Sequence, residues 1–125
     1  MALTGPTKGA AGVRAIPAMT TKRTDHYSAA VRQNARAMTF HRRRAYEEAA
    51  ELFVAALVSD PSHVLARYNL ACAFARLGQP EKAMSLLREI RDAKCPTCTE
   101  ILGRAAADED LASLRAQEDF RRLVE

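Results

Sequence analysis

Apolar residues recur at helical spacing along most of the chain. The clearest stripe lies between residues 46 and 59, where apolar side chains fall three or four residues apart: Tyr46, Ala49, Ala50, Phe53, Ala56 and Leu57. The same spacing predicts helices over about 25–43, 62–77 and 80–92, a weaker helix over 97–106, and two short amphipathic segments near the end. No segment alternates as a strand does. The pattern therefore predicts an all-α fold.

Helix-ending and helix-starting residues separate these segments. Asp60-Pro61 ends the second helix, because proline cannot continue a helix but suits the first turn of the next one. Gly78 follows the third helix, and Pro80 begins the fourth. The basic run His41–Arg44 closes the first helix, where cations complement the helix dipole. We expect antiparallel helices joined by short turns.

The sequence overlays on itself when it is shifted by 34 residues. Ala37 falls on Ala71, Phe40 on Phe74, Ala49 on Ala83, Phe53 on Leu87, Ala56 on Ile90, and Tyr46 on Pro80. In this respect the segment AYEEAAELFVAALVSDPSHVLARYNLACAFARLGQPEKAMSLL resembles the tetratricopeptide repeat family, whose paired helices have the same period. The resemblance is strong from Arg44 to Ile90 and implies an α-solenoid of antiparallel helix pairs.

The flanking parts depart from this repeat. Gln33 and Arg36 stand where the family has large apolar residues, so the first helix is expected to be longer or turned. In the third unit Pro96 comes one residue late, and Asp108 replaces an expected aromatic residue. The closing pattern D-x-D-L-x-x-L-R, followed by F-x-x-L, resembles the tail of small bacterial proteins of this kind. We therefore predict two tetratricopeptide-like repeats and a degenerate third that caps them.

Charge and composition divide the chain into two parts. Residues 1–45 hold nine basic residues and one acid, a net charge of +8, whereas residues 46–125 hold ten basic residues and fourteen acids, a net charge of −4. Residues 1–24 lack apolar periodicity, which predicts a basic, flexible N-terminal arm before a helical domain over 25–125. The arm is either a solvated tail or a contact for an acidic partner or nucleic acid, and it faintly resembles an organelle transit peptide. Ordering of the arm over an exposed repeat edge, or homo-oligomer formation, is expected to cover that edge.

Cysteine usage and hydropathy favour the cytoplasm. Three cysteines do not form a disulfide framework, and their low, odd number is typical of a reducing compartment. No stretch reaches the roughly 18–20 apolar residues of a membrane span, and the chain does not begin with the apolar run of a secretory signal. The sequence therefore predicts a cytoplasmic protein with no membrane span.

The resemblance also implies a binding surface. In this family the first helix of each pair lines a concave groove, and by position that groove holds Asn34, Met38, His41, Arg42, Leu65, Tyr68, Asn69, Cys72 and Arg76. Arg42 and Arg76 lie one repeat apart, which suits a clamp on the carboxylates of an acidic peptide. The predicted function is a non-catalytic protein–protein interaction module, an adaptor or assembly factor.

One activity of the family is not expected. Some members grip the C-terminal carboxylate of heat-shock chaperones. Asn69 matches one clamp position, but Asn34 and Met38 replace the expected lysine and asparagine.

The remaining chemistry gives weaker signals. The chain has no G-x-S-x-G, phosphate-loop or H-E-x-x-H motif, so we expect neither an enzyme nor a cofactor. The cluster His41–Arg44 lacks interleaved aromatic residues, which makes nucleic acid an unlikely partner. Cys95 and Cys98 allow three interpretations, namely a plain turn, half of a zinc site, or a redox-responsive dithiol. We favour the plain turn and predict no metal, with nucleic-acid association or redox response as the alternative function.

Overall fold

The structure is a computed structural model that describes residues 14–125; residues 1–13 lie outside the described part. Its helices are α1 (Tyr27–Arg42), α2 (Tyr46–Ser59), α3 (Val64–Arg76), α4 (Pro80–Ala93), α5 (Pro96–Leu102) and α6 (Glu118–Leu123). Two 3₁₀ segments, η2 (Ala105–Ala107) and η3 (Glu109–Leu114), lie between α5 and α6. The described residues form no strand, and the predicted all-α fold is confirmed.

The 34-residue period fixes the helix boundaries. α2 and α4 each contain 14 residues, and both their first and last residues are one period apart. α1 and α3 also end one period apart, at Arg42 and Arg76, but α1 has 16 residues and α3 has 13. The first helix is therefore longer than its counterpart, as we expected from the polar residues Gln33 and Arg36.

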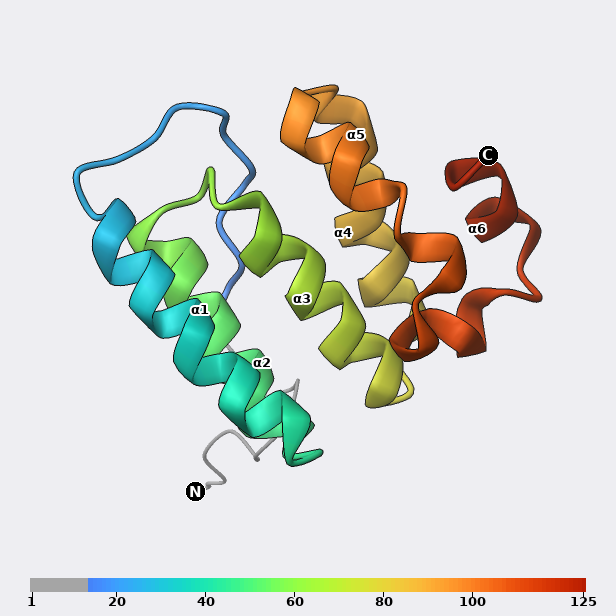
Figure 1. Ribbon diagram of the computed structural model, residues 1–125, viewed down its shortest axis with the longest axis horizontal. Helices are drawn as coiled ribbons and strands as arrows, with labels where there is room; N and C mark the ends of the chain where they lie inside the picture. The colour runs from blue at the N-terminus through green and yellow to red at the C-terminus, as the bar shows by residue number, and fades with distance from the viewer. Residues whose placement is uncertain (1–13) are drawn as a thin grey trace, which may run out of the picture.

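The helices stack in chain order as a small α-solenoid (Figure 1). α1 packs on α2, α2 on α3, and α3 on α4. Small residues at equivalent positions permit these close approaches, and all four are fully buried: Ala37, Ala49, Ala71 and Ala83. Phe53 and Phe74 fill the space beside them. The predicted helix pairs are thus confirmed.

The third unit is shorter than a full repeat. α5 packs on α4, η3 lies on α3, and α6 returns to α4 (Figure 1). Four apolar side chains fix this end of the chain to the core: Leu111, Leu114, Phe120 and Leu123. The weaker helix expected over 97–106 is limited to seven residues. This arrangement is that of a degenerate repeat that covers the second one.

The described part of the N-terminal arm, residues 14–24, has no helix and passes behind α3 in the view of Figure 1. The Thr20 N–H donates to the Pro61 carbonyl at 3.5 Å, and Arg67 Nη2 donates to the Pro17 carbonyl at 3.0 Å. Ile16 faces Phe74 and Leu86 across a hollow. These contacts lie within the stack, on α3, α4 and the turn before α3. The division between an arm at 1–24 and a domain at 25–125 stays a prediction, and part of the arm lies outside the described residues.

Among residues 14–125, no helix is both long enough and apolar enough to cross a membrane.

Candidate functional site

The predicted groove residues lie on two facing helical stripes. On α1 the stripe passes through Val31, Asn34 and Met38, and on α3 it passes through Leu65 and Asn69. Asn69 Nδ2 donates to Asn34 Oδ1 at 3.1 Å and so joins the two helices across the groove. The structure therefore joins two of the predicted residues, Asn34 and Asn69, directly.

One half of this groove is occupied by the chain itself. The Tyr68 hydroxyl donates to Asp108 Oδ2 at 2.7 Å, and Arg76 Nε donates to Asp110 Oδ1 at 2.7 Å. His41 Nε2 lies 2.8 Å from the other oxygen of Asp110. The Cys72 sulfur approaches Asp108 at 3.8 Å. Four predicted groove residues are thus engaged by the segment Asp108–Asp110, which we call the acidic segment.

Local hydrogen bonds and two leucines hold the acidic segment in place. Asp108 caps η3, where its Oδ1 accepts from the Asp110 N–H at 3.0 Å. Arg115 Nη2 donates to the Asp108 carbonyl at 3.2 Å. Leu111 and Leu114, which follow directly, are fully buried. The segment is therefore positioned by the core as well as by its charges.

The electrostatics of this half of the groove follow from burial and from Arg76. Burial alone would raise the pKa of Asp110, but hydrogen bonds from Arg76 and His41 outweigh it and hold that pKa below its ordinary value. Burial raises the pKa of Tyr68 and of Cys72, and the nearby Asp108 carboxylate adds to both shifts. Tyr68 and Cys72 therefore stay neutral, and the Cys72 thiol is a poor nucleophile.

One cluster of described residues has the composition of a metal site. Ligand atoms of Cys72, Asp108 and Asp110 all lie within 4.8 Å of one another. Each carboxylate already accepts a hydrogen bond, from Tyr68 in one case and from Arg76 in the other. Because the Arg76 cation bonds one carboxylate and the thiol is neutral, these residues fit a hydrogen-bonded cluster better than a metal centre.

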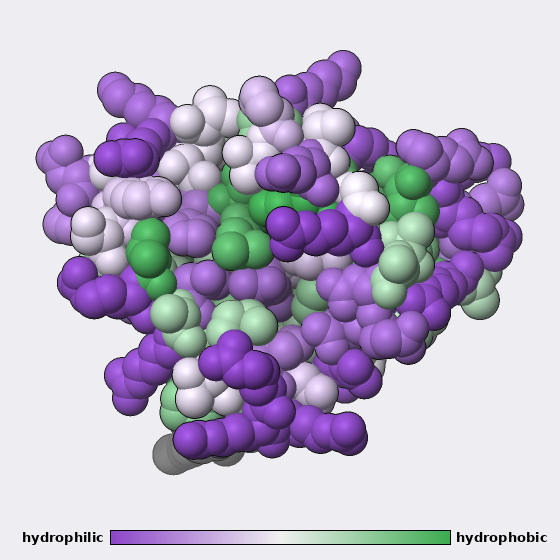
Figure 2. Space-filling model, in the orientation of Figure 1, coloured by the Kyte–Doolittle hydropathy of each residue, from purple (hydrophilic) through white to green (hydrophobic). Residues whose placement is uncertain are grey.

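The rest of the predicted groove face is exposed and partly apolar. Val31 is 40% exposed and Leu65 is 38% exposed, both on the face shared by α1 and α3. Apolar patches surrounded by polar side chains appear on the face shown in Figure 2. Arg42, at the far end of α1, is exposed to solvent. Of the predicted arginine pair, Arg76 holds a carboxylate of the chain's own acidic segment and Arg42 faces solvent.

The cysteine pair corrects one prediction. Cys95 and Cys98 lie at the predicted turn between α4 and α5, but they also form a disulfide, which the plain-turn interpretation did not include. Pro96 starts α5, and the spacing of three residues brings the Cα atoms of Cys95 and Cys98 to 4.9 Å, within the range that a disulfide requires. Cys72 is left as a buried free thiol.

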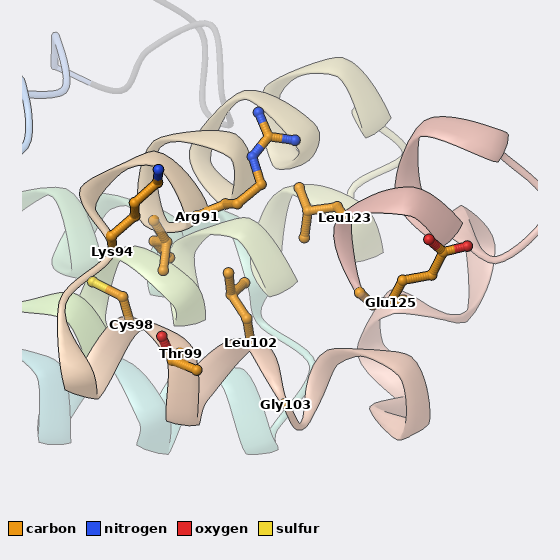
Figure 3. Close-up of a pocket in the computed structure, with 10 residues that line it drawn as sticks. Arg91, Lys94, Cys98, Thr99, Leu102, Gly103, Leu123 and Glu125 are labelled. Atoms are coloured by element: carbon orange, nitrogen blue, oxygen red, sulfur yellow. The ribbon is translucent and has the colours of Figure 1, made fainter.

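A hollow of about 320 Å³ lies beside this disulfide (Figure 3). α4, α5 and α6 form its walls, with Leu102 and Leu123 facing each other and with Arg91 and Lys94 along α4 and the residue after it. The repeat pattern did not predict this hollow, because it arises where α6 returns to α4 outside the 34-residue period.

The acidic segment was also missed as an occupant of the groove. A sequence signal exists in hindsight: Asp108 stands at the register of an aromatic residue, and the pattern D-x-D comes just before the buried leucines. The buried leucines bring this segment against the core, where Asp110 meets the Arg76 guanidinium and the His41 imidazole.

Stacked helix pairs that present a grooved face define the class of helical-repeat interaction proteins. Residues 41–94 match the family described as "Tetratricopeptide repeat", and this part of the chain is a tetratricopeptide-repeat segment. Such repeats generally mediate protein–protein interaction rather than catalysis.

Among curated proteins, a chloroplastic protein of Arabidopsis thaliana is 33% identical over 90 residues. The match covers 70% of this chain and 26% of that relative, so the chain spans about a quarter of the relative's length. No solved structure matches the chain.

Proposed function

We propose that the chain is a non-catalytic adaptor or assembly factor that binds a segment of a partner protein along the α1–α3 face. The observation that carries this proposal is the exposed part of the predicted groove face. There the exposed Val31 lies on α1 three residues before Asn34, and the exposed Leu65 lies on α3 four residues before Asn69, and the two asparagines are hydrogen-bonded to each other. Exposed apolar residues beside fixed polar groups are typical of surfaces that bind peptides.

The acidic segment indicates the chemistry that this face recognises. Within the chain, Tyr68, His41 and Arg76 together hold two carboxylates two residues apart. A partner segment with an apolar residue and nearby acidic residues suits the same face, with its apolar residue on Leu65 and its carboxylates toward Arg42. We therefore propose an acidic partner.

A pair of charge-introducing variants tests the groove. Leu65→Asp places a charge on this exposed face, whereas Val58→Asp places the same charge on α2, where Val58 is 47% exposed. Capture of binding proteins from the source cell, quantified by mass spectrometry, should lose the specific partner with Leu65→Asp and retain it with Val58→Asp. Equal retention by both variants would mean that partners bind elsewhere.

A cross-linking measurement locates the partner directly. A photoreactive amino acid at position 65 should form an adduct with the captured partner, and the same group at position 58 should not. The reverse pattern would move the binding face from the α1–α3 groove to the outer face of α2.

Cytoplasmic location is part of the proposal. The plant relative is named as a chloroplastic protein, and fractionation of cells that express the tagged chain decides the location for this one. Recovery in an organelle with a shortened N-terminus would favour the transit-peptide interpretation of residues 1–24.

Nucleic acid and self-association remain separate predictions. Arg42, Arg43 and Arg44 are exposed, but the neighbouring His41 is buried against Asp110 and is not available to phosphates. A nucleic-acid complex would weaken steeply between low and moderate salt. Sedimentation velocity over a range of concentrations tests for a homo-oligomer.

A further inference from the structure

We propose that Cys95 and Cys98 form a reversible dithiol–disulfide couple, in which Cys95 is the sulfur attacked by an external dithiol and Cys98 is the internal leaving sulfur. The proposal is independent of partner binding in the groove. The proposed cytoplasmic location bears on it in one respect: disulfides in that compartment are usually transient, catalytic or redox-sensing.

The two cysteines differ in access. Cys95 is half-buried and is followed by the exposed residues Pro96 and Thr97, whereas Cys98 is 1% exposed. An attacking thiolate must approach along the S–S axis and so needs one accessible sulfur. Cys95 is therefore the site of attack, and Cys98 is shielded from external thiols.

A backbone N–H donates to the attacked sulfur. Cys95 caps α5, and its sulfur accepts a hydrogen bond from the Cys98 N–H at 3.0 Å. A donated N–H favours a thiolate once the disulfide opens.

The position of the disulfide indicates a small contribution to the stability of the fold. It links residues only three apart, and the constraint that a disulfide imposes on the unfolded chain grows with the length of the loop that it closes. α5 is also held by other groups, since Ile101 is buried and Pro96 begins the helix. Opening the bond is expected to leave the fold intact.

The exchange has two balanced steps. A thiolate of the external dithiol attacks the sulfur of Cys95, the Cys95–Cys98 bond breaks, and Cys98 leaves as a thiolate that takes up a proton. The second thiol of the external dithiol loses its proton and attacks the mixed disulfide, which forms the external disulfide and releases Cys95 as a thiol. Two electrons and two protons pass from the external dithiol to the protein.

Single-cysteine variants of the full chain provide the sharpest test. Serine at position 95 keeps a helix cap, because serine is a preferred capping residue. After incubation with oxidised glutathione, Cys98→Ser should accumulate a mixed disulfide on Cys95, and Cys95→Ser should accumulate at least about tenfold less on Cys98, because the attacked sulfur must be accessible. Intact-protein mass spectrometry reads both. Equal labelling of the two variants would overturn the assignment of Cys95 as the attacked sulfur.

A redox titration tests reversibility in the unmutated chain. Maleimide labelling of the folded protein in buffers of reduced and oxidised dithiothreitol should show that Cys95 and Cys98 become reactive together as the buffer becomes more reducing. Far-ultraviolet circular dichroism should stay unchanged over the same range. Cys72→Ala serves as the control, because it removes the buried free thiol and should leave the titration unaltered. Resistance to excess reductant, or loss of helix on reduction, would show a structural disulfide instead.

Discussion

At the scale of single residues, Arg67 is the most informative side chain, because the pattern of apolar and polar positions alone would place an arginine on the surface. Arg67 is fully buried in α3. Its Nη1 donates to Glu89 at 3.0 Å, and its Nη2 donates to the carbonyls of Pro17 and Pro61 at 3.0 and 3.2 Å. Burial lowers its pKa and the Glu89 charge partly offsets the shift. Arg67 thus joins the arm, α3 and α4 at one point.

Replacement of Arg67 by methionine is expected to destabilise the fold by about 2 kcal/mol, because the apolar volume is kept while the half-buried carbonyls of Pro17 and Pro61 lose the Arg67 donor. Glu89 is 37% exposed and can turn to water, which limits the loss. Urea unfolding monitored by circular dichroism measures the difference. Arg36→Met, at an exposed position of α1, is the matched control and should leave the midpoint unchanged.

Two residues one period apart share a left-handed backbone. Gly78 follows α3 with a φ of 75°, and Arg44 follows α1 with a φ of 64°. Glycine adopts this region without a steric penalty. Arginine incurs a penalty there, because its Cβ approaches the backbone. The first repeat therefore stores a local strain that the second one avoids.

Removing the glycine at position 78 and introducing one at position 44 should have opposite effects on stability. Gly78→Ala is expected to cost about 1 kcal/mol through its φ alone, since an added Cβ would meet nothing within 4 Å. Arg44→Gly is expected to stabilise the fold by about 0.5 kcal/mol. Thermal unfolding measures both changes. Arg43→Gly, at a φ of −87°, should destabilise instead, and a gain there would contradict the strain argument.

At the scale of elements, η3 depends on charge in a way that the main helices do not. Its acidic segment is held by Arg76 and His41, so the docking of η3 on α3 should respond to pH. The pKa of Asp110 is lowered in the folded state relative to its ordinary 3.8. A carboxyl with a lowered folded pKa adds stability that is complete above the ordinary value. That stability is lost as the pH falls through the folded value.

Asp110→Asn should therefore destabilise the fold by about 1–2 kcal/mol at neutral pH and by much less in acid. The comparison is the unfolding free energy of variant and unmutated chain, measured from neutral pH down to the acid limit of folding. Glu51→Gln, at an exposed position on α2, provides the control and should show no such convergence. A constant difference across that range would mean that the charge of Asp110 is not what holds η3.

Elements inside the repeat could be predicted, and those outside it could not. Apolar periodicity placed α2 and α4 because Phe53, Leu87 and the small alanines define a buried stripe at helical spacing. The 3₁₀ segments have no such period, and a helix propensity does not distinguish them from a short α-helix. Their position depends on the burial of Leu111 and Leu114 in the core, and that burial follows from tertiary packing rather than from local sequence.

At the scale of the whole molecule, the repeat register predicted that Asn34 and Asn69 come together, but not that the acidic segment engages Tyr68, Arg76 and His41. The repeat register brought Asn34 and Asn69 to the same face, because both positions are set by helix geometry. The bonds of Asp108 and Asp110 join residues 34 to 69 positions apart, and the D-x-D pattern of a single sequence does not identify their partners. The same holds for the arm, which Arg67 reaches through a carbonyl 50 residues away.

The arm and Arg67 should act as one unit in stability. Deletion of residues 1–20 removes the Pro17 carbonyl and uncovers the surface of Phe74 and Leu86. Because the Arg67–Pro17 bond exists only when both partners are present, the deletion should cost about 1 kcal/mol less in an Arg67→Met background than in the unmutated chain. Urea unfolding of the four proteins of this cycle measures the coupling.

A second cycle, with Arg36→Met in place of Arg67→Met, separates this coupling from a general loss of stability. Arg36 is exposed on α1, away from the arm contacts of Arg67, so deletion and substitution should add within about 0.5 kcal/mol. If the Arg67 cycle is equally additive, the arm is held by Ile16 and its apolar neighbours alone. The buried arginine would then serve only to join α3 to α4 through Glu89.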